Sequence, residues 1–174
     1  MRMNKCIFLD RDGVLNVERG DYTYLPQDFK IIDGVPEAIK KIKEAGHLAI
    51  VITNQAGITK GIYTREQMRI CHEILLKKTS NLIDSIYYSP YHPSYSESLT
   101  RKPNTLMVEK AMAKFDIDPS GSWLIGDRCR DIECGQKMNL KTVLISEQNN
   151  YECTPTFIAK NLTEAVSGII QRKS

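Results

Sequence analysis

The sequence lacks long hydrophobic runs, and this absence excludes several classes of protein. No stretch approaches the roughly 20 apolar residues that a membrane-spanning helix needs, so we expect no membrane partner. The apolar run at residues 6–9 is interrupted at once by Asp10, so a signal peptide is not expected. Internal repeats and low-complexity segments are also absent. These features predict a cytoplasmic protein.

Closely spaced cysteine pairs and a strong charge of one sign are missing as well. The net charge is only +3, with Lys and Arg mixed among acids, so nucleic acid is not an expected partner, whereas a small anionic substrate is. No C-x-x-C pair occurs, and the number of cysteines is odd. We therefore interpret all five as free thiols in a reducing compartment, namely Cys6, Cys71, Cys129, Cys134 and Cys153.

Short apolar runs alternate with amphipathic patterns along the chain. Strands are predicted over residues 6–9, 48–52, 83–88, 122–125 and 141–145. Helices are predicted over residues 35–45, 64–78, 104–115, 130–138 and 162–171, with Thr64 and Asn104 as N-caps and Gln67 completing a capping box. This alternation predicts an α/β fold with a mainly parallel central sheet and helices on both faces, a Rossmann-like arrangement of three layers. We expect a single domain over residues 1–174.

Two carboxylates follow the first predicted strand, in the segment DRDGVLN. Ligands of a parallel sheet bind beyond the carboxyl ends of its strands, so Asp10 and Asp12 lie where chemistry is expected. One carboxylate can attack phosphorus while the other handles the proton of the leaving group, and both attract a hard cation. The structural alternative is an acidic turn in which Gly13 supplies a positive φ.

Polar residues follow the second predicted strand and recur further along the chain. The hydroxyl of Thr53 and the N–H groups after it can hold phosphate oxygens, although Thr and Asn also form caps and turns. Lys102, before Pro103, offers an ammonium group that could pair with a nucleophile and then with phosphoryl oxygens. Taken alone, a Lys before Pro carries almost no information.

A second acidic segment, Gly126 to Asp131, follows the strand predicted at residues 122–125. Gly126 allows a close backbone approach and Asp127 is a natural metal ligand. Asp131 is explained equally well as a carboxylate that supports the metal ligands and as an ordinary residue of the first helical turn. The order strand-DxDG, strand-T, K-P, strand-GD-x3-D is similar to the signature of the haloacid dehalogenase (HAD) superfamily of phosphohydrolases.

The likeness extends to one branch of that superfamily. The segments FLDRDGVLN, GDYTY, DGVPEAIKKIKEAG, VITNQAGITKG, IYY, RKP and LIGDRCRDIECG, within residues 5–145, resemble the D-glycero-D-manno-heptose 1,7-bisphosphate 7-phosphatases, relatives of the histidinol-phosphatases. The resemblance implies a magnesium-dependent enzyme of ADP- or GDP-heptose biosynthesis, and we expect it to be a monomer. It would hydrolyse the 7-phosphate of a small phosphorylated sugar through an aspartyl-phosphate.

The resemblance also assigns roles to residues. It makes Asp10 the nucleophile and Asp12 the general acid/base, with Thr53 and Lys102 stabilising the phosphoryl group. The magnesium ligands would be Asp10, the backbone carbonyl of Asp12, and Asp127. The substrate-contacting positions would be Glu18, Arg19, Gly20, Asp21, Asn54, Gln55, Arg101 and Arg128.

One loop departs from the family pattern. Many relatives carry zinc ligands before R-K-P, spaced C-x-H and then C-x-C, but here these four positions are Ser89, Tyr91, Ser98 and Thr100. His92 remains, and one imidazole does not make a structural zinc site, so no structural zinc is expected. We expect packing of Tyr91 and Tyr95 to hold the loop instead.

The spacing leaves no room for a separate cap domain, because 40 residues separate Asp12 from Thr53 and 48 separate Thr53 from Lys102. The site should be open, with Lys60, Arg101 and Arg128 as candidates to meet anionic groups; for Lys60 we rank a solvated loop charge first. A histidinol-phosphate or other sugar-phosphate phosphatase stays an alternative. A receiver-type signalling domain ranks lower, because its phosphorylated Asp lies on a middle strand, and a silent binding module ranks last.

Overall fold

A parallel sheet forms the centre of the molecule. The computed structural model describes residues 3–148 and 151–172, so the ends of the domain expected over residues 1–174 lie outside the described residues. The strands are β1 (Lys5–Leu9), β2 (His47–Asn54), β3 (Ser85–Ser89), β4 (Trp123–Gly126), β5 (Lys141–Ile145) and β6 (Phe157–Ala159). Their order is β3-β2-β1-β4-β5-β6 and every pairing is parallel, which confirms the predicted sheet. The edge strand β6 was not predicted, because three residues are too few to show a pattern.

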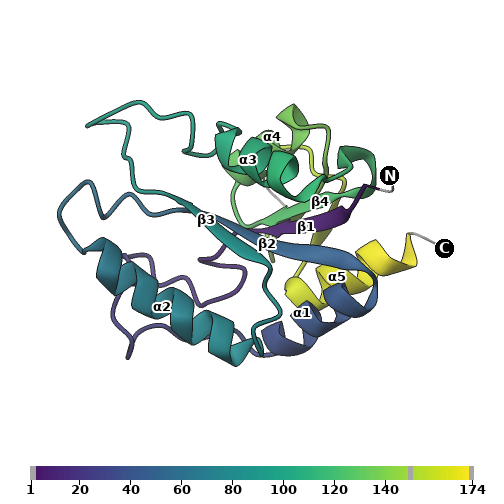
Figure 1. Cartoon of the computed structure of the whole chain (residues 1–174), viewed down its shortest axis with the longest axis horizontal. Coiled ribbons are helices and arrows are strands. Elements are labelled where there is room, and N and C mark those ends of the chain that lie inside the picture. The colour runs from purple at the N-terminus through teal and green to yellow at the C-terminus, as the bar shows by residue number, and fades with distance from the viewer. Residues whose placement is uncertain (1–2, 149–150, 173–174) are drawn as a thin grey trace.

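Helices cover both faces of this sheet. They are α1 (Val35–Glu44), α2 (Arg65–Lys78), α3 (Leu106–Phe115), α4 (Cys129–Lys137) and α5 (Leu162–Gln171), with a 3-10 turn at Pro119–Gly121. Helices α1, α2 and α5 lie on one face, and α3 and α4 on the other (Figure 1). The three-layer prediction is therefore confirmed.

The central strand β1 explains why its sequence is continuously apolar. Ile7 and Leu9 belong to the core under α1 and α5, whereas Cys6 and Phe8 belong to the core under α3. Successive side chains of a strand point to opposite faces, and all four side chains here are fully buried. A strand buried on both faces can place Asp10, the next residue, at the edge where the sheet opens to a ligand.

Two helix starts test the predicted caps. Thr64 caps α2 as expected, since its hydroxyl accepts the Gln67 backbone N–H at 3.2 Å and the Gln67 side chain accepts the Thr64 N–H at 2.9 Å. Asn104, however, is not the cap of α3, which begins at Leu106 after Thr105. The Asn104 side chain instead donates to the Ser98 carbonyl at 3.0 Å, so it serves the preceding loop.

The interpretation of all cysteines as free thiols was wrong for two of them. Cys129, the first residue of α4, forms a disulfide with Cys153 in the segment before β6. These residues are 24 positions apart in sequence, and only the fold brings their Cα atoms to 5.4 Å. The remaining cysteines, Cys6, Cys71 and Cys134, are free and buried. In the described part of the chain, no helix combines the length and apolar character needed to cross a membrane.

Candidate active site

The predicted chemical groups come together at the carboxyl edge of the central strands. Asp10 follows β1, Thr53 lies near the end of β2, and Asp127 follows β4, and β1 lies between those two strands. The Asp10 N–H donates to the carbonyl of Ile125 at 2.9 Å, which ties the turn after β1 to β4. The fold therefore brings the polar residues that follow the first, second and fourth predicted strands to one edge of the sheet.

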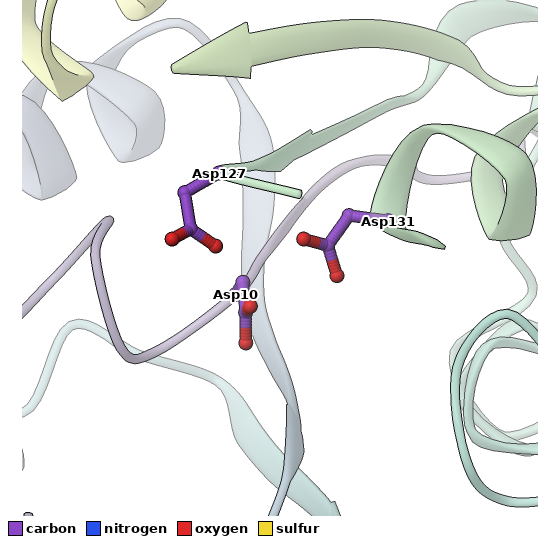
Figure 2. Close-up of side chains that lie close together, drawn as sticks. All are labelled: Asp10, Asp127 and Asp131. Carbon is purple, nitrogen blue, oxygen red and sulfur yellow. The ribbon is translucent and has the colours of Figure 1, made fainter. Parts of the chain in front are cut away.

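Three carboxylates crowd this edge. Asp10, Asp127 and Asp131 each offer an oxygen atom, and these oxygens lie within 4.8 Å of one another. Figure 2 shows the three side chains converging from the turn after β1, the end of β4 and the start of α4. Two glycines permit the approach, because a Cβ on Gly13 would lie 2.4 Å from Asp127 Oδ2 and one on Gly126 would lie 2.2 Å from Asp131 Cβ.

The crowding shifts the acidity of the cluster. Burial raises the pKa of Asp10 to about 7, with Lys102 opposing the shift and Asp131 and Asp127 adding to it. Burial and Asp131 together raise the pKa of Asp127 to about 6. Carboxylates whose charged form is disfavoured in this way attract a cation, because a cation offsets their mutual repulsion.

Lys102 supplies one cation from within the protein. Its ammonium lies 2.8 Å from Asp10 Oδ1 and 2.7 Å from Asp131 Oδ1, and it donates to the Ile52 carbonyl at 2.8 Å. Burial alone would lower the pKa of Lys102, but the two carboxylates outweigh burial and raise it. The Asn54 amide fixes the backbone here, accepting the Lys102 N–H at 3.0 Å and donating to the Lys102 carbonyl at 3.1 Å.

Asp12 is held by a different set of partners. Its Oδ1 accepts from the guanidinium of Arg11 at 2.8 Å and from the Asn16 amide at 3.0 Å, and its Oδ2 accepts from the Gln55 amide at 3.0 Å. Burial alone would raise the pKa of Asp12, but Arg11 and these hydrogen bonds hold it below its ordinary value. The resting site therefore favours the carboxylate form of Asp12.

A pocket of about 380 Å³ opens above Asp10 and Asp12. Of the predicted substrate-contacting positions, it is lined by Glu18, Gly20, Asp21, Asn54, Gln55, Arg101 and Arg128. Arg19 is not part of the lining; it forms an ion pair with Asp28 at 2.7 Å. Lys60 is also outside the lining, with its ammonium 5.6 Å from the centre of the Tyr22 ring.

Several residues of the site were not assigned from the sequence. Arg11, which stands between Asp10 and Asp12 in sequence, is buried and pairs with Asp12. In the sequence, only its position inside the DxDG motif could have indicated that it belongs to the site. In the fold Asp131 has both of the roles considered for it. Its Oδ1 lies 2.7 Å from the Lys102 ammonium, and its Oδ2 accepts the Arg128 N–H at 3.1 Å in the first turn of α4. Arg130 and Tyr63 line the pocket and gave no signal in the sequence.

The loop before Lys102 is organised by hydroxyl groups. The side-chain oxygen of Thr100 lies 2.8 Å from that of Ser89 and 2.7 Å from that of Ser98. We call these three residues the hydroxyl cluster. They occupy three of the four positions that correspond to zinc ligands in the family pattern. The expected packing of two tyrosines is not what holds the loop, because Tyr91 and Tyr95 are exposed by 37% and 63%.

Comparison with known proteins agrees with this fold and site. A family model described as HAD-hydrolase-like matches residues 99–165. A D-glycero-D-manno-heptose-1,7-bisphosphate 7-phosphatase of Chlorobaculum tepidum is 38% identical, over 98% of this chain and 96% of that protein. A D-glycero-beta-D-manno-heptose-1,7-bisphosphate 7-phosphatase of Haemophilus influenzae is 38% identical over 76% of each chain.

The fold is also that of a solved structure. The D,D-heptose 1,7-bisphosphate phosphatase of B. bronchiseptica, crystallised with magnesium and phosphate, superimposes with a TM-score of 0.85 at 22% identity, over 97% of this chain and 99% of that one. Sheet order, acidic edge and these matches define a phosphatase of the HAD type. With 38% identity over nearly the whole of both proteins, the chain belongs to the family of the D-glycero-D-manno-heptose-1,7-bisphosphate 7-phosphatases.

Proposed function

We propose that this enzyme removes the 7-phosphate of D-glycero-D-manno-heptose 1,7-bisphosphate through a phosphorylated Asp10. The observation that carries the mechanism is the pairing of Asp10 with Lys102 at the open end of the sheet. Asp10 Oδ1 accepts the Arg11 N–H at 2.7 Å and lies 2.8 Å from Lys102, so both contacts fall on one oxygen. Oδ2 accepts no hydrogen bond from the described residues and is the oxygen that attacks phosphorus.

Lys102 and Thr53 meet the charge that develops on the transferred phosphoryl group. Negative charge spreads over its oxygens during transfer, and prearranged donors stabilise it. The buried ammonium of Lys102 cannot move away, because Asp131 and the Ile52 carbonyl hold it from the other side. Thr53 is itself fully buried and fixed by the Gln55 amide at 2.8 Å.

Asp12 handles protons in both halves of the reaction. In the first half, Asp12 acts in its protonated form, which the resting contacts disfavour. It gives its proton to the departing sugar oxygen as Asp10 forms its bond to phosphorus and the bond from phosphorus to that oxygen breaks. In the second, the Asp12 carboxylate takes a proton from water, the water oxygen attacks phosphorus, and Asp10 is released. The contacts from Arg11, Asn16 and Gln55 suit the carboxylate of this second half.

The acidic cluster fits magnesium as the resident cation. Mg²⁺ prefers oxygen ligands, and Asp10 and Asp127 present carboxylates whose pKa values are raised first by burial and then by their mutual repulsion, both of which a cation would offset. Asp131 belongs to the same cluster but pairs with Lys102. We therefore assign the metal to Asp10 and Asp127, with the Asp12 carbonyl as in the family pattern. When bound, magnesium neutralises charge on the phosphoryl oxygens.

The pocket has the chemistry of a sugar carrying a second anion. Glu18 and Asp21 supply carboxylates for hydroxyls, and three arginines supply positive charge, namely Arg101, Arg128 and Arg130. Burial lowers the pKa of Arg101, and the like charge of Arg130 adds to this, so an anion between the two guanidinium groups would be stabilised. We assign the remote phosphate of the bisphosphate to these arginines.

Phosphate release tests the function. The purified protein is given heptose 1,7-bisphosphate and histidinol phosphate side by side, each with magnesium and with a chelator. We expect fast release from the bisphosphate that the chelator abolishes. Preference for histidinol phosphate would move the chain to that alternative and keep the mechanism, whereas chelator-resistant release would contradict the magnesium site.

We also propose that the whole chain acts as one domain, as a monomer, in the cytoplasm, where phosphorylated sugars are handled, and without structural zinc. Light scattering during size-exclusion chromatography measures the oligomeric state. A mass above the 19.8 kDa of one chain would contradict the monomer. Metal analysis of the purified protein would contradict the zinc-free loop if it returned one zinc per chain.

A further inference from the structure

Gln55 links Asp12 and Thr53, two polar residues to which the proposed function gives catalytic roles. Its amide nitrogen donates to Asp12 Oδ2 at 3.0 Å and to the Thr53 hydroxyl at 2.8 Å. Its amide oxygen accepts from the Tyr63 hydroxyl at 2.6 Å. Every polar atom of this side chain is therefore engaged, and only 2% of the residue is exposed.

The chemistry of the partners allows only one orientation of this amide. A carboxylate only accepts hydrogen bonds, so Asp12 requires an N–H group. If the amide were rotated by half a turn, its oxygen would face the Asp12 carboxylate and the two would repel. The Tyr63 hydroxyl can donate to the amide oxygen, and burial raises the pKa of Tyr63, which keeps its proton in place.

The surroundings hold Tyr63 at this position. Its ring stacks on Tyr24 with centroids 5.0 Å apart and an interplanar angle of 11°, and it lies at 58° to the Tyr22 ring. Gly57 leaves the space that the ring fills, since a Cβ there would lie 2.1 Å from the Tyr63 Cε1 atom. Tyr63 is 5% exposed, so water does not readily replace its hydroxyl.

We propose that Tyr63 is a positioning residue, whose hydroxyl fixes the Gln55 amide so that it donates to Asp12 and Thr53 at once. Gln55 then acts on the catalytic groups and not as a direct substrate ligand through its side chain. This inference rests on the proposed function, because it takes Asp12 and Thr53 to be the groups that act on the phosphoryl ester.

Amide exchange tests the orientation without any substrate. The Gln55 side-chain signals in a nitrogen–proton NMR spectrum are identified by their absence in Gln55→Ala. We expect slow exchange with D2O in the wild type. Tyr24→Phe is the control and should exchange equally slowly, because the hydroxyl of Tyr24 forms no hydrogen bond among the described residues. Tyr63→Phe should speed this exchange by about tenfold or more, because it leaves a buried acceptor without a donor. Unchanged protection in Tyr63→Phe would overturn the proposal.

Turnover tests the consequence for catalysis. With the best phosphate ester found for the wild type, we expect Tyr63→Phe to lower kcat by about tenfold with KM changed by less than about twofold. Tyr24→Phe should keep kcat within about twofold. In a Gln55→Ala background, Tyr63→Phe should have no further effect on kcat, since it acts through Gln55. An equal loss in both backgrounds would assign Tyr63 an ordinary structural role and overturn the proposal.

A second variant guards against a trivial loss of folding. Gly57→Ala keeps the hydroxyl but displaces the ring that carries it, so it should reproduce the faster Gln55 exchange and the lower kcat. Normal exchange and turnover in Gly57→Ala with a displaced ring would contradict the proposal. Because exchange needs no substrate, failure of the proposed function, seen as no phosphate release by the wild type, is separate from failure of this inference.

Discussion

The ammonium group of Lys102 is held by three oxygen atoms, two of them from carboxylates. Its contacts with Asp10, Asp131 and the Ile52 carbonyl are all 2.8 Å or shorter, and the side chain is buried. A cation fixed so tightly costs no reorganisation when charge develops on a phosphoryl group beside Asp10. The same arrangement leaves two buried carboxylates without a counter-charge if the lysine is removed.

Lys102→Ala should therefore lose at least about 100-fold in kcat, which is typical for removal of one donor from such a site. Steady-state phosphate release with saturating magnesium measures this. Lys110→Ala, on the exposed surface of α3, is the matched control and should keep wild-type turnover. A Lys102→Ala enzyme with turnover near that of the wild type would contradict the role given to this residue.

His72 makes the stability of the fold sensitive to acid. Burial lowers the pKa of His72 to about 3 and the charge of Arg11 adds to this, against 6.5 for a free imidazole. Between these values the unfolded chain binds a proton that the folded protein does not, so stability is complete above pH 6.5 and falls as the pH drops toward 3.

At pH 5 the loss of unfolding free energy from this residue should be about 2 kcal/mol, from about 1.4 kcal/mol per pH unit. Glutamine at position 72 does not titrate. Lowering the pH from 7 to 5 should therefore reduce the unfolding free energy of His72→Gln by about 2 kcal/mol less than it reduces that of the wild type. Urea unfolding of both proteins at the two pH values measures the difference. An identical pH dependence would mean that His72 does not control it.

At the scale of elements, the segment between β3 and α3 shows how a loop is fixed without a metal. Ser89 closes β3 and its carbonyl accepts the Gln55 N–H at 2.7 Å, so the hydroxyl cluster is anchored to the site at one end. At the other end Thr100 is followed directly by Arg101, whose guanidinium donates to the Tyr91 carbonyl at 3.1 Å. The loop therefore positions a pocket-lining arginine.

Thr100→Val should disturb substrate binding more than chemistry. It removes both side-chain hydrogen bonds of the cluster while keeping the shape of the residue, and we expect a loss of about 1–2 kcal/mol of stability. KM should rise by about 3- to 10-fold, with a smaller change in kcat. Ser94→Ala, in an exposed part of the same loop, is the control. A fall confined to kcat would contradict this reading.

At the scale of the whole molecule, the disulfide joins parts that the sheet already brings near. Cys129 begins α4 between two pocket-lining arginines, and Cys153 lies in the segment leading to β6. Disulfides are uncommon in reducing compartments. The bond between Cys129 and Cys153 therefore conflicts with the proposed cytoplasmic location, in which both cysteines would be reduced. Their state in the cell decides how firmly the start of α4 is held.

Counting thiols measures that state. Protein purified without reductant and denatured should show three reactive thiols if the bond is formed, since two of the five cysteines are paired, and five if it is not. Reduction should lower the unfolding free energy by at most about 3.5 kcal/mol, the effect expected for closing a loop of this length. Five thiols in untreated protein would contradict the bond.

The sequence by itself determined the α/β class, the sheet and the position of the main acids, because each depends on local signals. Continuous apolar runs mark buried strands, and a carboxylate directly after such a run, as at Asp10 and Asp127, must lie at the edge of the sheet. The order of the motifs was enough to indicate a phosphatase of the HAD type.

Only the tertiary structure decided which distant side chains meet. Lys102 and Asp131 are 29 positions apart in sequence, Arg11 and His72 are 61 apart, and Cys129 and Cys153 are 24 apart. No periodic pattern encodes such contacts, since they depend on how helices pack on the sheet and not on local conformation. The same reason explains why Asp131 stayed open and why the hydroxyl cluster and the Tyr63–Gln55 contact were visible only after folding.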